Sequence, residues 1–390
     1  MSDVINNNWS ETKTALLEGL NGHKKSVMDV TLENTRKYLA EAASSGATSA
    51  GNVATLNRVI LPVIRRVMPT VIANEIVGVQ PMTGPVGQIH TLRVRYAESY
   101  DTAVAGEEAL SPFKIAEGYS GNETSNKADN TAALEGTPGK KMSIQILKQA
   151  VEAKTRKLSA RWTFEAAQDA QAQQGIDVEA EIMAALAQEI TTEIDQEILA
   201  SLRSLASVEE TYNQAAVSGT ATFVGDEHAA LAIQINRVAN KIAARTRRGA
   251  GNFAVVSNQA LTILQSATTS AFARTTEGTF EAPTNTKMVG TLNGAMKVFV
   301  DAYLADSGQD DNQVLVGYKG SSEADAAAFY CPYIPLMSSG VVLDPATFEP
   351  VVGFMTRYGY IELSNTASSL GNAADYLGKV SITSANVSFS

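Results

Sequence analysis

Few residues that carry enzymatic chemistry stand at catalytic spacing in this sequence. The nearest approach to a phosphate-binding loop is Gly136-Thr137-Pro138-Gly139-Lys140-Lys141, whose spacing and final residue both differ from the G-x-x-x-x-G-K-[ST] motif. Gly118-Tyr119-Ser120-Gly121 lacks the second spaced glycine of a serine-hydrolase elbow. Both motifs therefore predict loop tips, and we expect no catalytic residue. A carboxylate pair stays open as an alternative, because such pairs form in space.

Metal and disulfide chemistry is equally sparse. Cys331 is the only cysteine, so an internal disulfide and a multi-cysteine metal site are excluded. The three histidines, His23, His90 and His228, are far apart along the chain. A zinc site needs several such ligands together. We expect neither a metal nor a cofactor.

The overall charge argues against a nucleic-acid-binding domain. The 390 residues carry a formal net charge of −10. Domains that bind the phosphate backbone of nucleic acids have an excess of Lys and Arg instead. An acidic protein can still enclose DNA without adhering to it. The chain has no run of 18 apolar residues and no secretory signal at its start, so we expect no membrane association.

Long helices dominate the first half of the predicted structure. Residues 9–43 have amphipathic helical spacing, which Asn21-Gly22 divides into two pieces. The clearest helix runs from Val178 to Ala206, about 43 Å at 1.5 Å per residue, with Asp177 as its N-cap. Its apolar residues recur every four positions, at Val178, Ile182, Leu186, Ile190, Ile194, Ile198 and Leu202. Such a stripe winds round the helix and needs several partners along its length.

The remaining segments predict a mixture of strands and helices. Residues 97–140 are polar and lack an evident core, which is typical of a disordered segment or an extended functional loop. Helical signals return at Met142. From Asp226 helices alternate with short strands, and the tail from Phe329 is rich in strands. The sequence thus predicts an α+β fold.

Two groups of arginines are candidates for contacts between subunits. Arg245, Arg247 and Arg248 end a predicted helix, where cations favour the macrodipole; the alternative is an ion pair with a neighbouring chain. Arg65 and Arg66 are either solvated or paired across an interface.

Four stretches resemble the T-even-type phage major capsid protein family, and they occur in the family's order. They are LPVIRRVMPTVIANEIVGVQPMTGPVGQI (61–89), EAKTRKLSARWTFEAAQDAQAQQGIDVEAEI (152–182), ARTRRGAGNFAVVS (244–257), and VGYKGSSEADAAAFYCPYIPLMSSGVV followed by DPATFEPVVGFMTRYG, which ends at Gly359. Together they are spread over the chain from about residue 60 to residue 360.

The resemblance implies a Hong Kong 97-like phage capsid fold and a domain plan. The expected parts are an N-terminal helical segment (1–41), the N-terminal arm and entry to the peripheral domain (42–91), the extended loop (92–160), the peripheral domain with its spine helix (161–225), the axial domain (226–340), and a return to the peripheral domain (341–390). Longer relatives carry an inserted domain in the extended loop, and here the region is too short for one.

The resemblance also implies partners and processing. Family members assemble as hexamers in a closed shell that encloses DNA without sequence-specific binding. A scaffold and a maturation protease act during assembly, with vertex, portal and decoration proteins as further partners. The expected location is the virion capsid, reached through the host cytoplasm. The protease cuts after Glu in an [IL]-x-E pattern. Leu39-Ala40-Glu41 followed by Ala42 fits at the helix-to-linker junction, although residues 16–18 and 115–117 match too.

Two alternatives to a phage shell protein were considered. An encapsulin-like compartment shell would share the fold, and its neighbouring genes would discriminate it. An enzyme with a spatially assembled carboxylate site would instead show a monomer with one deep polar pocket.

Overall fold

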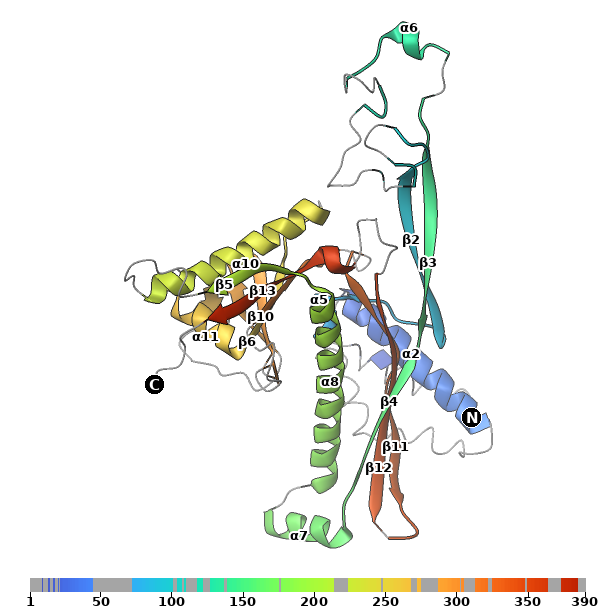
Figure 1. Cartoon of the computed structure of the whole chain (residues 1–390). Helices are drawn as coiled ribbons and strands as arrows, with labels where there is room; N and C mark the ends of the chain where they lie inside the picture. The colour runs from blue at the N-terminus through green and yellow to red at the C-terminus, as the bar shows by residue number, and fades with distance from the viewer. Residues whose placement is uncertain are drawn as a thin grey trace. The chain divides into compact units, whose positions relative to one another are not determined.

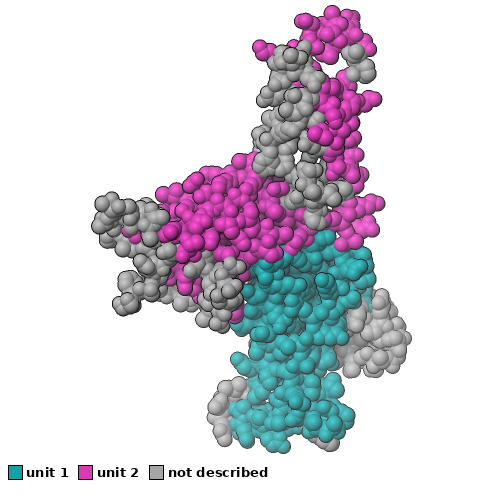
Figure 2. Space-filling view, in the orientation of Figure 1, with its two compact units in different colours: residues 1–87, 151–201, 329–361 teal, residues 88–150, 202–328, 362–390 magenta. Residues whose placement is uncertain are grey.

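The computed structural model describes most of the chain. Its described residues are 9, 13, 14, 17, 20, 22–44, 72–100, 104–106, 109, 118–121, 127–136, 139–174, 177–213, 224–246, 248–267, 272–274, 287–301, 303, 304, 313–321, 325–347, 349–363 and 373–384. The predicted α+β class is confirmed. The chain forms two compact units (Figure 2), and each consists of three separate stretches. Unit 1 is Met1–Gly87, Val151–Ser201 and Phe329–Ile361; unit 2 is Gln88–Ala150, Leu202–Ala328 and Glu362–Ser390.

Unit 1 contains a four-stranded sheet in the order β1-β11-β12-β4. These strands are β1 (Gly78–Val79), β11 (Ala328–Leu343), β12 (Pro350–Glu362) and β4 (Lys154–Arg161). β1 runs parallel to β11, and β4 runs antiparallel to β12. Burial alternates along β12, where Val352, Phe354 and Tyr358 are buried. One face of the sheet therefore packs into the core of the unit.

Most of the long helix α8 (Val178–Leu205) belongs to unit 1. Its last four residues, from Leu202, belong to unit 2. Its predicted cap is confirmed, because Asp177 Oδ1 accepts hydrogen bonds from the backbone N–H groups of Glu179 at 3.1 Å and Ala180 at 3.4 Å. The predicted stripe is buried from Leu186 through Leu202. The shorter helix α7 (Phe164–Gln174) precedes α8.

The N-terminal helix α2 (Gly22–Ser44) also belongs to unit 1. The predicted break at Asn21-Gly22 is confirmed, since Gly22 has a φ of 61°, a conformation that glycine adopts at no steric cost. The inward face of α2 is buried. The short helix α5 (Ala73–Ile76) leads into β1.

Unit 2 is built around a seven-stranded sheet in the order β5-β13-β10-β6-β9-β8-β7. The strands are β5 (Val208–Asn213), β6 (Phe253–Ser257), β7 (Phe272–Arg274), β8 (Lys287–Leu292), β9 (Met296–Asp301), β10 (Gln313–Gly317) and β13 (Leu377–Ser384). Asn293 and Gly294, both with positive φ, form the tight turn between β8 and β9. The short helix η2 (Ala373–Tyr376) precedes β13.

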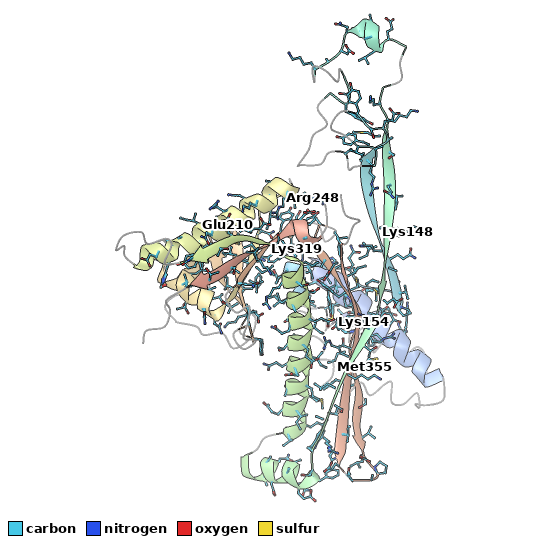
Figure 3. All side chains as sticks on the ribbon, in the orientation of Figure 1. Lys148, Lys154, Glu210, Arg248, Lys319 and Met355 are labelled. Carbon is cyan, nitrogen blue, oxygen red and sulfur yellow. The ribbon has the colours of Figure 1, made fainter. Side chains whose placement is uncertain are left out.

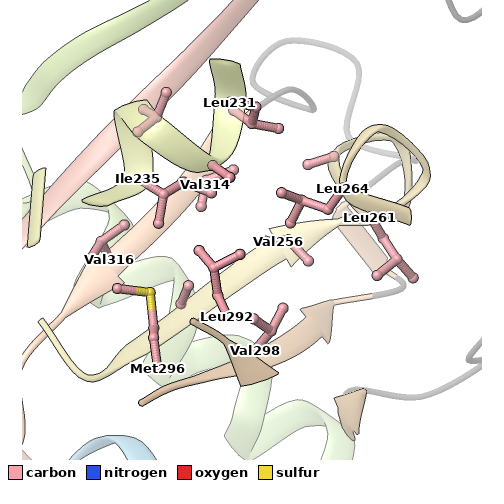
Figure 4. Close-up of a cluster of buried hydrophobic side chains, with 14 of the residues drawn as sticks. Leu231, Ile235, Val256, Leu261, Leu264, Leu292, Met296, Val298, Val314 and Val316 are labelled. Carbon is pink, nitrogen blue, oxygen red and sulfur yellow. The ribbon is translucent and has the colours of Figure 1, made fainter. Parts of the chain in front are cut away.

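Two helices close the core of this sheet (Figure 4). Helix α10 (Val224–Thr246) supplies Leu231, Ile235, Val238 and Ile242, all fully buried at helical spacing. Helix α11 (Asn258–Ser266) adds Leu261 and Leu264, and the Ser257 side chain caps it by accepting from the Ala260 N–H. Both helices and the strands of this core match the predicted pattern.

A buried ion pair fixes the end of α8 within unit 2. Arg203 pairs with Asp301 at the end of β9, and the Asp301 side chain is completely buried. Asp301 also accepts a hydrogen bond from the Tyr303 N–H at 3.1 Å. Each charge is the counter-ion of the other, because burial of either charge without a partner would cost folding free energy.

A two-stranded ribbon consists of β2 (Val86–Tyr96) and β3 (Met142–Glu152), with the single-turn helix α6 (Thr131–Leu134) between them in the chain (Figure 1). The prediction that helical signals return at Met142 is wrong, because Met142–Glu152 and Lys154–Arg161 are strands. Lys, Gln and Leu favour helices individually, but Met142, Ile144 and Ile146 alternate with the period of a strand.

The prediction that residues 97–140 lack a core is also wrong for their described part. Tyr96, Ala109 and Tyr119 form a small buried cluster, with Tyr100 packed against it. The Tyr119 hydroxyl donates to the Lys141 carbonyl at 2.6 Å, and Tyr100 donates to the Gly121 carbonyl at 3.0 Å. Lys140 lies over the Tyr100 ring at 3.3 Å from its centroid. This loop therefore carries a tyrosine core of its own.

Candidate assembly surfaces

The β2–β3 ribbon presents an exposed apolar face. Met142, Ile144 and Ile146 are 51%, 68% and 59% exposed, and as alternate residues of one strand they point to the same side. Lys148 continues this side of β3 (Figure 3). A row of three large apolar side chains in water is unusual for a protein that acts as a monomer. The row is therefore a candidate surface for contact with another molecule.

A second apolar patch lies at the far end of β11. The strand is buried from Ala328 to Leu336, but Val341, Val342 and Leu343 are exposed as it approaches the turn into β12. A backbone hydrogen bond from the Asp344 N–H to the Glu349 carbonyl closes that turn. Unit 1 thus has a buried sheet that ends in an exposed apolar tip.

Charge is distributed unevenly over neighbouring elements. Residues 139–161, which form β3 and β4, contain seven basic residues (Lys140, Lys141, Lys148, Lys154, Arg156, Lys157, Arg161) and only one acidic residue, Glu152. Helix α8 shows the reverse, with six acidic residues (Glu179, Glu181, Glu189, Glu193, Asp195, Glu197) and one basic residue, Arg203. Opposite charges on separate elements favour both internal pairing and contacts between copies.

Part of this charge is paired inside unit 1. The Arg156 guanidinium, from β4, donates to Glu193 at 2.7 Å, to Glu197, and to the Tyr358 hydroxyl at 2.6 Å. The Tyr358 hydroxyl, from β12, donates to Glu197 at 2.5 Å. The network joins α8 to two strands of the sheet and orients the helix against them.

The network also sets the protonation of its members. Burial alone would raise the pKa of Glu197, but the hydrogen bonds from Arg156 and Tyr358 outweigh it and lower that pKa below its ordinary 4.5. Burial and the bond to Glu197 raise the pKa of Tyr358. Glu197 therefore stays ionised and Tyr358 stays protonated at neutral pH, the states that the hydrogen bonds require.

Comparison with known proteins shows the family to which the chain belongs. A family model described as Major capsid protein Gp23 matches residues 53–140 and 113–382. The chain belongs to this family of phage major capsid proteins. The major capsid protein of Vibrio phage KVP40 is 29% identical over 95% of this chain and 88% of its own length. That of Enterobacteria phage T4 is also 29% identical, over 83% of this chain and 78% of its own length.

Solved phage capsids resemble this capsid protein only distantly. The capsid of Myoviridae phage XM1 matches with a TM-score of 0.44 at 11% identity, over 78% of this chain and 88% of that one. The mature capsid of bacteriophage PhiM1 matches with a TM-score of 0.44 at 13% identity, over 80% and 86%.

The predicted arginines of this capsid protein have different settings. Arg245 lies in the last turn of α10 and pairs with Glu209, a residue of β5. Arg248 pairs with Asp325 at 2.5 Å (Figure 3). Both charges therefore have partners within the same chain. Arg65, Arg66 and Arg247 lie outside the described residues.

The predicted cleavage position lies inside a helix. Glu41 and Ala42 belong to the last turn of α2, which ends at Ser44. Proteases act on extended chain, so this turn must unwind before a cut there. The predicted cut, after Glu41, therefore lies three residues before the end of α2. The sequence predicted it at the junction between helix and linker.

Sequence reasoning missed the apolar face of β3, although the alternation of Met142, Ile144 and Ile146 was a signal for it. No group of three or more His, Cys, Asp or Glu side chains in the described part of the chain is arranged to hold a metal ion. No helix in the described ranges is long and apolar enough to cross a membrane.

Proposed function

We propose that this capsid protein assembles into hexameric capsomers that close into the icosahedral head of a tailed phage around double-stranded DNA. Membership of the capsid family supports the proposal, and the exposed apolar face of β3 is the observation in the molecule that carries it. The role is structural, and no residue is assigned to catalysis. The net charge of −10 suits a shell that does not adhere to its DNA.

The expected domain plan is proposed for the described elements with changed bounds, because residues from Phe329 belong to unit 1 and both β5 and β13 belong to the sheet of unit 2. Unit 1, with its four-stranded sheet and α8, corresponds to the peripheral domain. The seven-stranded sheet with α10 and α11 corresponds to the axial domain, and the β2–β3 ribbon to the extended loop. On this plan the ribbon begins at Val86 and the peripheral domain resumes at Val151, so both ends of the loop shift toward the N-terminus from the expected 92–160.

The occupant proposed for the β3 face is another copy of this chain. A shell repeats each contact many times, so a modest apolar face on every subunit sums to a large total stabilisation. Lys140 and Lys141, just before β3, and Lys148 within it complement the acidic α8, where Glu181 and Glu189 are exposed. A ribbon that lies across the spine helix of a neighbour would bury its apolar row and pair these charges.

The proposed partners during assembly are a scaffold, a maturation protease, and vertex, portal and decoration proteins. We place the protease cut between Glu41 and Ala42. The inward face of α2 is occupied within unit 1, so scaffold binding is assigned to the exposed side of the N-terminal helices. Assembly would take place in the host cytoplasm, with the virion capsid as the final location.

Negative-stain electron microscopy tests the assembly proposal. The chain is expressed alone and with its neighbouring phage genes. Closed shells, tubes or hexameric rings are expected in at least one condition. A dispersed monomer in both conditions would contradict self-assembly.

Mass spectrometry of purified virions tests the cleavage proposal separately. The expected N-terminal peptide begins at Ala42. A virion chain with an intact N-terminus, or one that begins elsewhere, would show that Glu41 is not the processing site.

A further inference from the structure

The inward face of α2 is part of the core of unit 1. Val27, Met28 and Leu32 are each less than 5% exposed, Thr31 is fully buried and Asn34 is 6% exposed. These residues recur at helical spacing on one side of α2, while the residues from Gly22 to Ser26 are exposed. A segment proposed for removal is therefore packed as closely as residues of the permanent core.

Polar contacts join the same helix to the segment that follows it in unit 1. Asn34 Nδ2 donates to the backbone carbonyls of Met82 at 2.7 Å and Tyr333 at 3.1 Å. His23 Nε2 lies 2.7 Å from the Val79 carbonyl, and Lys24 pairs with Glu75 at 2.9 Å. From His23 to Asn34 the contacts extend over about 17 Å of helix.

Asn34 completes a hydrogen-bond ladder that the strands leave open. β1 pairs with β11, and the ladder continues when the Gln80 N–H donates to the Tyr330 carbonyl and the Met82 N–H donates to the Pro332 carbonyl. The Met82 carbonyl, which follows at the end of this ladder, accepts from Asn34, and so does the backbone carbonyl of Tyr333 in β11. Loss of α2 would remove this donor and uncover the apolar surface beneath Leu32.

We propose that α2 is a docked clamp: after a cut in its last turn or beyond it, the N-terminal piece remains bound to unit 1, so that its departure is a separate step. Departure uncovers a surface made by residues 75–82 and the middle of β11. The biological use of the clamp rests on the proposed removal of residues 1–41. The docking itself does not depend on it.

The test separates the cut from the departure. A recognition sequence for a site-specific protease is placed in the full chain between residues 46 and 50, beyond the end of α2. After complete cleavage, native mass spectrometry and gel filtration measure whether the N-terminal piece stays with the remainder. We expect one complex of both pieces that persists through gel filtration.

Two variants show whether the described contacts hold the clamp. Asn34→Asp keeps the shape of the side chain but turns the donor into a carboxylate that faces two carbonyl oxygens. Leu32→Ala leaves a cavity. Each should release the piece at least roughly tenfold faster than the unsubstituted cut chain. Ser26→Asp, which adds the same charge on the exposed side of α2, is the matched control and should release at the unsubstituted rate.

The outcomes do not overlap with those of the assembly and cleavage experiments. Separation of the pieces immediately after the engineered cut would overturn the clamp, even if shells form and virions begin at Ala42. Retention that is equal in Asn34→Asp, Leu32→Ala and Ser26→Asp would also overturn it. A circular dichroism melt of each uncut variant verifies that the fold is intact before cleavage.

Discussion

Replacement of Ile144 by Asp should abolish assembly while leaving the subunit folded. Full burial of an isoleucine side chain contributes about 1.5–3 kcal/mol, and because Ile144 is 68% exposed, about 1–2 kcal/mol remains to be gained when a neighbour covers it. An unpaired carboxylate buried in the same contact adds a cost of at least about 3 kcal/mol. The two effects together weaken each contact by about 4 kcal/mol, or roughly a thousandfold in the concentration needed for assembly.

The assay is light scattering of purified subunits over a range of concentrations, with electron microscopy of the products. Gln145→Asp is the matched control, because Gln145 is exposed on the opposite side of the same strand. It should shift the assembly threshold far less, and thermal unfolding of both unassembled variants should match that of the wild type. Normal assembly of Ile144→Asp, or an equal loss in Gln145→Asp, would refute the assignment of this face to the shell contact.

Three further predictions concern stability within the subunit. Asp301→Ala leaves the largely buried Arg203 without its counter-ion and should lower the free energy of unfolding by about 3–5 kcal/mol in denaturant titrations; a loss below about 1 kcal/mol would contradict the buried-pair interpretation. Because the folded pKa of Glu197 lies below 4.5, its ionised form stabilises the fold above that pH and the contribution is lost as pH falls through the folded pKa. Glu197→Gln should therefore lose less stability than wild type on acidification below pH 4.5, measured by urea midpoints, and an unchanged acid loss would argue against it. Tyr119→Phe removes the bond to the Lys141 carbonyl and should speed amide hydrogen exchange at Ala97 and Gly106, with no change in β6 and β9.

Elements with one buried face were predictable from their periodicity. The stripe of α8 and the inward face of α10 place apolar residues at helical spacing, so the sequence pattern and the burial agree. The short strand β6 is instead buried at every position, which its continuous apolar run indicates. The Asp177 cap was predictable because capping uses only the next few residues of the chain.

Features that depend on distant residues were not predictable in this way. The ribbon strand β3 is exposed on nearly all its described positions, so no buried face reinforces its alternation, and its Lys, Gln and Leu residues suggest a helix. The tyrosine core of the loop joins Tyr96 to Tyr119, and Arg248 meets Asp325 across 77 positions. Nothing in the local sequence near Asn34 indicates that it bonds to Tyr333.

The interleaving of the two units has a consequence for the order of events during synthesis. β4, near residue 160, pairs with β12, and β1 pairs with β11, so neither early strand has its partner until residues 328–362 have been made. In unit 2, β5 pairs with β13, which ends at Ser384. Such long-range pairings fold slowly and leave strand edges open on the ribosome. Unit 1 therefore closes only after residue 361 has been made and unit 2 only after residue 384, and a chain that stops before residue 328 can complete neither of them.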